Sequence, residues 1–156
     1  MTMSLSTPVT GLAQTGLTSP TYTLTVDTPP SGSNVVKQWA VTALGGTQNG
    51  VLIHSGSVPF TISAIRPANY RGLSPVGTNG LLRAVPRNTM KLVVRKGVTP
   101  LAGQSPAILV ASLVIDVPAG SPDADANSVA AAISLLGGAV SQLAAGIGDT
   151  AKSNIF

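Results

Sequence analysis

Few residues of this chain could take part in catalysis. Among its 156 residues there are one histidine, five aspartates, no cysteine and no glutamate. A histidine-based triad would have to combine His54 with an aspartate and with a serine that no motif marks. His54 lies in "LIHSG", which is typical of a strand or a turn. We therefore expect no catalytic centre and interpret His54 as a structural residue.

Metal and cofactor sites are equally poorly supported. Asp123 and Asp125 form a close pair of carboxylates, but two are too few for calcium, and a chain without cysteine cannot form a thiolate site. A helix start explains the pair better, because the helix dipole favours acids in the first turn. The segments "GTQNG" and "GLSPVGTNG" lack the lysine and the strand–helix context of a phosphate loop. We expect no metal and no cofactor.

The basic residues gather in one interval that contains no acid. No carboxylate lies between Asp27 and Asp116, yet eight of the nine basic residues fall there. They are Lys37, Arg66, Arg71, Arg83, Arg87, Lys91, Arg95 and Lys96. Such segregation predicts a cationic surface that binds a polyanion, above all a nucleic acid. The alternative is a solvated basic face that only aids solubility, although solubility is normally served by mixed signs.

The composition indicates a single domain, residues 1–156, whose surface is largely covered by other molecules. Only 9% of the residues are charged and 44% are hydrophobic, which favours extensive self-association. The N-terminus lacks the basic start and long apolar run of a signal peptide. The uncharged stretch 126–148 is long enough to span a bilayer, but it contains five polar side chains and four glycines. We expect no membrane partner.

Residues 1–118 are predicted to be rich in β-strands. Short runs in which apolar and polar residues alternate are each closed by turn residues. The expected strands are 21–27, 35–43, 51–57, 59–67, 86–97 and 107–118, with "LLRAV" leading into the fifth. Asn49–Gly50 is a hairpin signal. Because the connections are too short for helical crossovers, neighbouring strands should be antiparallel.

Residues 119–156 are predicted to be helical. Ser121 is expected to cap the first helix, with Pro122 at its first position. Three apolar residues at i, i+4, i+7 spacing then share one face. Gly137–Gly138 is expected to end or kink that helix, and "AVSQLAAGIGDTAKS" to form a second one. The expected fold class is therefore α+β, an antiparallel sheet of about six strands followed by two C-terminal α-helices.

The segment "VIDVPAGSPDADANSVAAAISLLGGAVSQLAAGIGDTAKSNIF" (114–156) resembles the tail of the coat proteins of single-stranded RNA bacteriophages, the leviviruses. In that family the last strand ends in a proline, and an Asp-rich helix start precedes an Ala/Leu helix. A Gly break and a second helix bearing "IGD" follow. A fainter similarity through the strands extends the resemblance over residues 20–156.

The resemblance implies a structural protein of the virion that forms dimers. Two subunits would pair into one continuous sheet, and the helices of each would pack across the partner. Dimers would assemble in the cytoplasm of the bacterial host into an icosahedral shell around the single-stranded RNA genome. The inner sheet face would bind RNA, including a stem-loop at the replicase start whose capture represses translation.

The resemblance also implies RNA-binding residues at matching positions. In "PFTISAIRP", Thr61 and Ser63 match a Thr-x-Ser pattern that family members place against RNA. In "NTMKLVV", Thr89 and Lys91 match the Thr-x-Lys pattern of the neighbouring strand. These four residues would converge on one face, where the hydroxyls bond phosphate, ribose or base edges and Lys91 supplies a positive charge. The alternative is that they are ordinary solvent-facing strand residues.

Further positions extend or depart from this pattern. Arg95 and Arg66 would extend the positive field beside these four residues. On the last strand, counting back from Pro118, Val110 and Ser112 occupy positions where the best-known members carry a base-stacking tyrosine and an asparagine. Ser112 is retained as a candidate contact, but valine cannot stack on a base as an aromatic ring does. Charge-driven packaging is therefore expected rather than tight recognition of one hairpin.

Three other functions compete with this interpretation. A cellular β-rich nucleic-acid-binding domain would share the basic central face without forming a shell. An extracellular adhesion module would suit the abundant Thr, Ser and Gly, but not the N-terminus. An enzyme is the least supported, because the chain offers so few catalytic groups.

Overall fold

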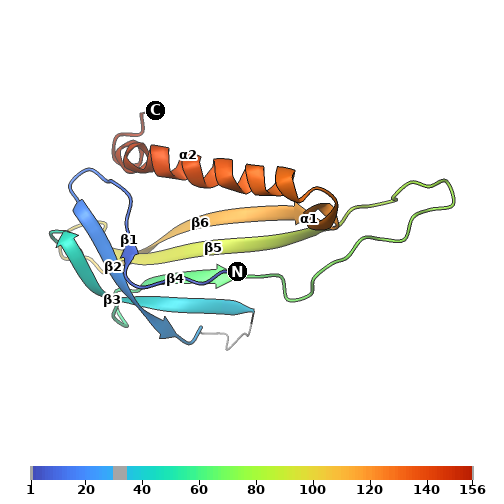
Figure 1. The fold of residues 1–156 in the computed structure, drawn as a ribbon. Helices are drawn as coiled ribbons and strands as arrows, with labels where there is room; N and C mark the ends of the chain where they lie inside the picture. Colours follow the sequence, from blue (N-terminus) through green and yellow to red (C-terminus); the bar gives the residue numbers. More distant parts are fainter. Residues whose placement is uncertain (1, 30–34, 156) are drawn as a thin grey trace.

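The computed structural model describes residues 2–29 and 35–155, which form one antiparallel sheet followed by a helical C-terminal part (Figure 1). The strands are β1 (Val9–Thr10), β2 (Thr18–Asp27), β3 (Val36–Thr47), β4 (Phe60–Ile65), β5 (Arg87–Val98) and β6 (Ala107–Pro118). The six strands pair in the order of the chain, each antiparallel to the next. Two helices follow, α1 (Ser121–Ala124) and α2 (Ala126–Ser153). The predicted α+β class is confirmed.

Five of the predicted strands correspond to β2, β3, β4, β5 and β6, but the predicted strand 51–57 is wrong. That segment is the connection between β3 and β4. The backbone N–H of His54 donates to the carbonyl of Val41 (2.9 Å), and its Nδ1 accepts from the N–H of Phe60 (3.0 Å). These bonds tie the connection to the middle of β3 and to the first residue of β4. His54 therefore has the structural role that we expected.

The strand register divides the side chains of the sheet between two faces. Directly opposed residues of antiparallel strands point to the same side, and successive residues along a strand alternate. The apolar face carries Leu24, Trp39, Ile62, Ala64, Leu92 and Val94. The polar face carries Gln38, Thr61, Ser63, Lys91, Arg95 and Ser112. The sheet can therefore form a core on one side and present hydrogen-bonding and charged groups on the other.

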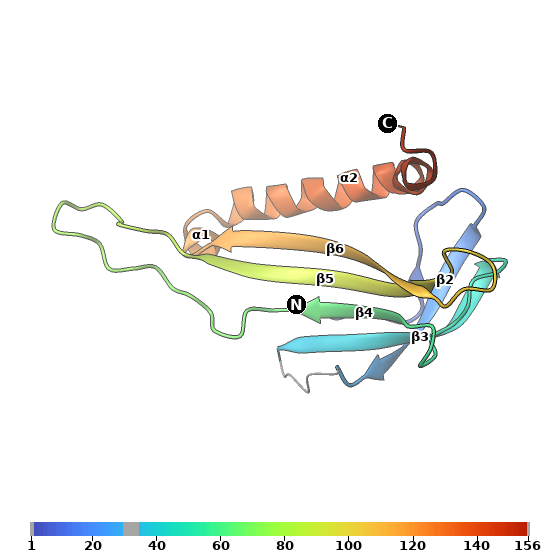
Figure 2. The same cartoon turned by 180° about the vertical axis from the view of Figure 1, so that it is seen from behind.

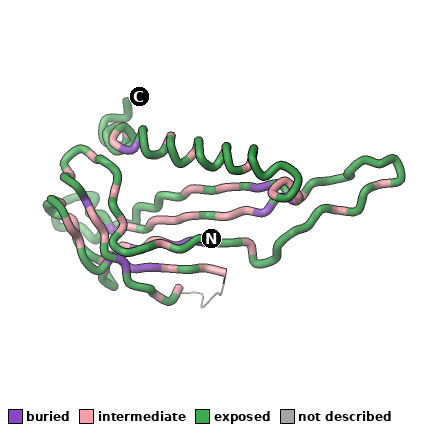
Figure 3. The backbone as a smooth tube through the Cα atoms, in the orientation of Figure 1, coloured by how far each residue is buried: buried purple, intermediate pink, exposed green. Residues whose placement is uncertain are grey.

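The core lies on the apolar face and is thin. Leu24, Trp39, Val41 and Ala64 are buried together, and the rings of Tyr22 and Phe60 meet edge to face at 5.7 Å beside them. In the described part of the chain no large side chain is less than 2% exposed. Figure 3 shows the buried residues as short, separate stretches in a mostly exposed backbone. A single subunit thus leaves much of its apolar surface uncovered.

The C-terminal helix differs from the prediction in its start and in its continuity. Gly120, with φ +79°, precedes α1, and the Ser121 hydroxyl donates to the carbonyl of Pro118 (2.7 Å) instead of capping. Asp125 caps α2, since its carboxylate accepts from the N–H of Ser128 (3.3 Å). The helix α2 is continuous through Gly137–Gly138, so the prediction that a helix ends there is wrong. Glycine weakens a helix interior without forbidding it.

The helix α2 stands on the β6 side of the sheet and is mostly exposed (Figures 1 and 2). Its C-terminal half is tied to the N-terminal region, because the Gln14 side chain donates to the carbonyl of Ala144 (2.6 Å) and the Thr15 hydroxyl to the Asp149 carboxylate (3.0 Å). By length and composition alone α2 could cross a membrane. A single helix of this kind is weak evidence for a span, because core helices of soluble proteins and signal sequences pass the same test.

Between β4 and β5 the chain forms a long projection, residues 66–86, which we call the arm (Figure 1). Its root is held by Asn88, which is only 5% exposed. The N–H of Arg71 donates to Asn88 Oδ1 and Asn88 Nδ2 donates to the carbonyl of Arg71, both at 2.8 Å. One buried carboxamide thus satisfies both backbone groups of an arm residue. The segment "LLRAV", expected to lead into a strand, belongs to the arm.

Replacing Asn88 by alanine is expected to destabilise the fold. The change leaves both Arg71 backbone groups without their partner, which should lower the free energy of unfolding by about 2 kcal/mol. Urea denaturation followed by circular dichroism measures the effect. The exposed Asn69 is the control, since its replacement by alanine should change stability by less than about 0.5 kcal/mol. Equal midpoints for Asn88→Ala and the unaltered chain would contradict the proposed clamp.

Candidate nucleic-acid interface

The register brings most of the predicted RNA-binding residues onto the polar face. Thr61 of β4 lies opposite Arg95 of β5, and Ile65 lies opposite Lys91. Ser63 and Ser112 lie on either side of Val93, the first on β4 and the second on β6. Thr89 shares the orientation of Lys91, two residues along the same strand. Six of the seven candidates therefore point to one side of the sheet, opposite the core.

These six residues differ in how far they are accessible. Thr61 is 5% exposed and Ser63 is 6% exposed, so neighbouring side chains cover both hydroxyls almost completely. Thr89 is half-buried. Lys91, Arg95 and Ser112 are exposed. The fully exposed candidates are therefore two cations and the hydroxyl of Ser112, whereas the hydroxyls of Thr61 and Ser63 are covered.

A chain of polar side chains crosses the polar face from β4 to β2. The Ser63 hydroxyl donates to Gln38 Oε1 (3.1 Å), and Gln38 Nε2 donates to the Asp27 carboxylate (2.7 Å). Gln38 and Asp27 were not among the predicted residues. The sequence predicts toward which face of its strand each of these two side chains points. Only the pairing of β2, β3 and β4 brings them beside Ser63. Ser63 is thus already engaged as a donor within the subunit.

The polar face also carries acid, which the acid-free interval of the sequence did not lead us to expect. Asp116 of β6 lies opposite Thr89 and accepts a hydrogen bond from its hydroxyl. Asp27 lies at the end of β2 on the same face. Two of the five carboxylates therefore share this surface with the cations. The Thr89 hydroxyl is bonded to a carboxylate, so phosphate would be repelled at this position.

The cations of the polar face form a row along one strand. Arg87, Lys91 and Arg95 lie four residues apart on β5, and all three are exposed. Neighbours in the row are about 13 Å apart along an extended strand. Within the described residues neither Lys91 nor Arg95 has an ion-pair partner for its charged group. Arg87 was not named as a candidate, although its alternation with Lys91 would have identified it.

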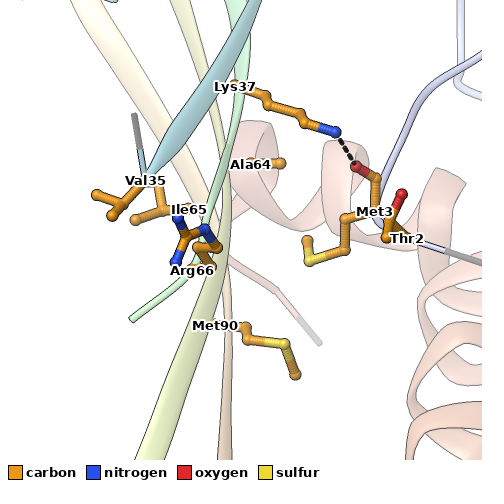
Figure 4. A pocket seen from close by; sticks show the side chains of 8 residues that line it. All are labelled: Thr2, Met3, Val35, Lys37, Ala64, Ile65, Arg66 and Met90. Atoms are coloured by element: carbon orange, nitrogen blue, oxygen red, sulfur yellow. Dashed lines mark hydrogen bonds between the residues drawn. The ribbon is translucent and has the colours of Figure 1, made fainter. Parts of the chain in front are cut away.

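The remaining basic residues do not join this row. Lys37 lies opposite Ala64, on the apolar face, and its ammonium donates to the carbonyl of Met3 (3.4 Å; Figure 4). Arg66 follows the last residue of β4 at the end of the sheet and lines a pocket of about 450 Å³ together with Lys37 and Met90. Its guanidinium donates to the carbonyl of Pro67 (3.4 Å). Arg66 is thus the one candidate that the structure leaves outside the polar face.

Lys96 has a structural position on the apolar face. Its ammonium donates to the carbonyl of Leu52 (2.9 Å) and lies 4.8 Å from the centre of the Phe60 ring. Partial burial lowers the pKa of Lys96. Its side chain therefore fastens the β3–β4 connection to β5 and is not free to meet a ligand.

A depression of about 380 Å³ opens on the polar face beside this row. Its lining consists of Pro29, Val36, Gln38, Ser63, Ile65, Val93, Arg95 and Val110. The walls are mostly aliphatic, with one amide, one hydroxyl and one guanidinium among them. Val110 is 58% exposed at its rim, in the place expected of a stacking ring. The depression could admit a flat, partly apolar group such as a base, with a cation beside it for the attached phosphate.

The acidic residues of the described parts of the chain form no cluster suited to a metal ion. Residues 2–29 and 35–155 contain no group of three or more His, Asp or Glu side chains placed to hold a metal ion. Asp125 is used as a helix cap, and Asp123 lies in the first turn of α1.

Comparison with known proteins identifies a solved structure that this chain resembles over nearly its whole length. No protein-family model and no curated protein matches it. Among solved structures, the virus-like particle of bacteriophage ESE020 matches with a TM-score of 0.95 and 52% sequence identity. The match covers 99% of this chain and 100% of that chain.

The chain belongs to the bacteriophage coat proteins. The resemblance seen in the sequence is thereby confirmed at the level of a phage coat protein, and the fold is confirmed over its whole length. A coat protein has a structural and not an enzymatic role, which agrees with the scarcity of catalytic groups. The coat protein's polar face, with its row of cations, is the surface to which a function must still be assigned.

Proposed function

We propose that this coat protein encloses the genome of a single-stranded RNA bacteriophage. Its subunits form dimers, the dimers close into an icosahedral shell in the cytoplasm of the bacterial host, and the polar face binds the genomic RNA. The observation that carries the proposal is the row Arg87, Lys91 and Arg95 on the face opposite the core. The C-terminal sequence supports the RNA-phage type, since it resembles the tail of those coat proteins.

The edge strand β6 supports the dimer. It pairs with β5 over 12 residues and forms one edge of the sheet, whereas β1, at the other edge, has only two. Of the 12 residues of β6, Asp116 alone is charged, and Ile108, Leu109 and Val110 are about half exposed. Such a long, apolar, unprotected edge is a template for pairing with another strand. A second copy of β6 completes it and makes one continuous sheet.

The apolar face and α2 support the same dimer. A cavity of about 600 Å³ on the apolar face is lined by residues of β2, β3, β4 and β5, among them Leu24, Val41 and Ile62. On α2, Leu143 and Ile147 are more than half exposed on the side that also carries Val129. Because α2 stands beyond β6, its apolar side is placed to cover the sheet of the β6 partner. Each helix then supplies the cover that the other subunit's core lacks.

RNA binding on the polar face is expected to depend mainly on charge. Lys91 and Arg95 of two subunits present four exposed cations to the interior of the shell, and Arg87 adds two more. Without a stacking ring at Val110, the face lacks a feature that gives strong recognition of one base. Packaging of genomic RNA is therefore the primary role, and repression of replicase translation through a stem-loop is secondary.

Expression of the unaltered coat protein in bacteria tests the proposal. We expect uniform, closed particles in electron micrographs, and we expect copurified nucleic acid that is degraded by ribonuclease and not by deoxyribonuclease after the particles are opened. Dimers or monomers alone, at every protein concentration and with RNA added, would favour a cellular nucleic-acid-binding domain instead. Particles that contain no RNA would retain the shell and refute the RNA contact.

A further inference from the structure

The arm, residues 66–86, is a structured projection with a fixed root and a defined tip. At the root, Asn88 binds both backbone groups of Arg71. Leu73 also packs there against Gly120, where an added Cβ would lie 2.5 Å from its Cδ1. At the tip, the N–H of Gly77 donates to the carbonyl of Leu81 (3.0 Å), and Asn79 Oδ1 accepts from the N–H of Leu81 (3.3 Å). The arm therefore presents its side chains in a set arrangement.

The side chains that the arm presents are mainly apolar. Its large exposed hydrophobic residues are Tyr70, Leu73, Val76, Leu81, Leu82 and Val85. Val76 and Leu81, on either side of the tip turn, are 61% and 66% exposed. The arm contains no acid. A gathered apolar surface of this kind on a soluble chain marks a site of interaction with another protein.

We propose that the arm binds a second copy of this coat protein and joins neighbouring dimers in the shell. This inference rests on the proposed function, because it presumes that the dimers assemble. The occupant of the arm's apolar surface is a subunit other than the one that pairs through β6.

The direction of the arm supports this choice of partner. Figures 1 and 2 both show the arm continuing past the ends of β5 and β6, roughly along the strands and beyond the sheet. Pairing at β6 extends the sheet sideways, at right angles to the strands. The arm therefore leaves the region that the β6 partner occupies and reaches toward the next dimer.

The chemistry of the arm distinguishes a protein partner from RNA. Single-stranded RNA is bound by cations along its backbone and by aromatic rings on its bases. The arm as a whole carries three arginines and Tyr70, but its tip, from Val76 to Leu82, has neither a basic residue nor an aromatic one. The matched protein of the ESE020 virus-like particle covers 99% of this chain, so the arm has a counterpart in a protein that is surrounded by copies of itself.

The double variant Val76→Ser/Leu81→Ser tests the inference. It should form dimers as the unaltered chain does, because both side chains are exposed in the subunit. Loss of two apolar contacts per subunit should reduce the yield of particles at equal protein concentration by roughly tenfold or more. Size-exclusion chromatography measures dimers and particles together. The control is Ser74→Ala/Thr78→Ala in the same arm, which should assemble normally; normal assembly of Val76→Ser/Leu81→Ser would overturn the inference.

A labelling experiment keeps the test valid if that variant folds poorly. The chain has no cysteine, so Val76→Cys introduces a unique thiol at the tip. The thiol should react with a maleimide in dissociated dimers and be protected in particles. Equal reactivity in both states would overturn the inference, as would protection that disappears when RNA alone is removed from intact particles.

The outcomes separate this inference from the proposed function. An unaltered chain that never assembles would refute both. An unaltered chain that assembles, beside arm variants that assemble equally well, would refute the arm contact alone.

Discussion

Replacing Lys91 and Arg95 together by alanine is expected to abolish most RNA binding by the coat protein while leaving its fold intact. Both side chains are exposed on the polar face, and neither charged group has an ion-pair partner within the described residues. In a dimer the change removes four cations from one surface. Of the charged groups named on that face, the carboxylates of Asp27 and Asp116 and the guanidinium of Arg87 would then remain. Negative charge would therefore exceed positive charge.

The salt dependence of RNA affinity measures this effect most directly. Contact with about four phosphates lowers affinity roughly a hundredfold between about 50 and 200 mM salt, because binding releases condensed counterions. Titration of a short RNA stem at several salt concentrations should show that dependence for the unaltered protein. It should be nearly flat for Lys91→Ala/Arg95→Ala, whose particles should also retain little RNA.

The matched control is Lys37→Ala/Arg83→Ala, which removes the same net charge from the apolar face and the arm. Its salt dependence should equal that of the unaltered protein. Urea midpoints should be similar for all three proteins, since exposed charges contribute little to stability. A flattened dependence in the control would mean that the general charge of the protein, and not the polar face, drives binding. An unchanged dependence in Lys91→Ala/Arg95→Ala would show that these residues do not touch phosphate.

The alternation of residue types was enough to predict which side of each strand a candidate occupies. In β5 successive side chains point to opposite faces, so Thr89, Lys91 and Arg95, which are separated by even numbers of residues, had to share a face. The same rule applied to β4 placed Thr61 with Ser63. Local sequence was less informative where the chain leaves a regular element. The β3–β4 connection has the composition of a strand, but His54 bonds to both neighbouring strands and holds it as a loop.

The composition of the polar face could not be predicted, because it depends on which strands are neighbours. Asp27 and Asp116 lie outside the basic interval of the sequence, yet β2 and β6 bring them to the same surface as Lys91. The hydrogen bond of the Ser63 hydroxyl likewise depends on Gln38, which lies on a different strand. The continuity of α2 through Gly137–Gly138 could not be predicted either. Glycine only weakens a helix interior, so the local sequence alone does not decide whether a long helix ends there.

A second large effect is expected from the double variant Leu143→Asp/Ile147→Asp, which should dissociate the coat-protein dimer. Leu143 and Ile147 lie four residues apart on α2, and they are 59% and 56% exposed in the single subunit. If α2 covers the partner's apolar face, the dimer buries four such side chains. Completing the burial of a half-exposed leucine or isoleucine contributes about 1 kcal/mol. Their loss alone should weaken the dimer roughly a thousandfold.

Aspartate adds a further cost, because a carboxylate enclosed between apolar surfaces loses its hydration without gaining a partner. Analytical ultracentrifugation over a range of concentrations measures the dissociation constant. The control is Ser141→Asp/Gln142→Asp, at two exposed polar positions next to this pair in sequence but on other sides of the helix. The two variants share the added charge and the low helix propensity of aspartate, so that only the position of the side chains differs.

The control should remain dimeric, whereas Leu143→Asp/Ile147→Asp should sediment as a monomer at micromolar concentration and form no particles. The monomer should keep its helical signal in circular dichroism, because Gln14 and Thr15 still bond to α2. A variant that stays dimeric with the affinity of the unaltered protein would mean that the apolar side of α2 is covered by something other than the β6 partner. In a single subunit the apolar face of the sheet is only thinly covered. Loss of the partner's α2 should therefore expose that face to solvent.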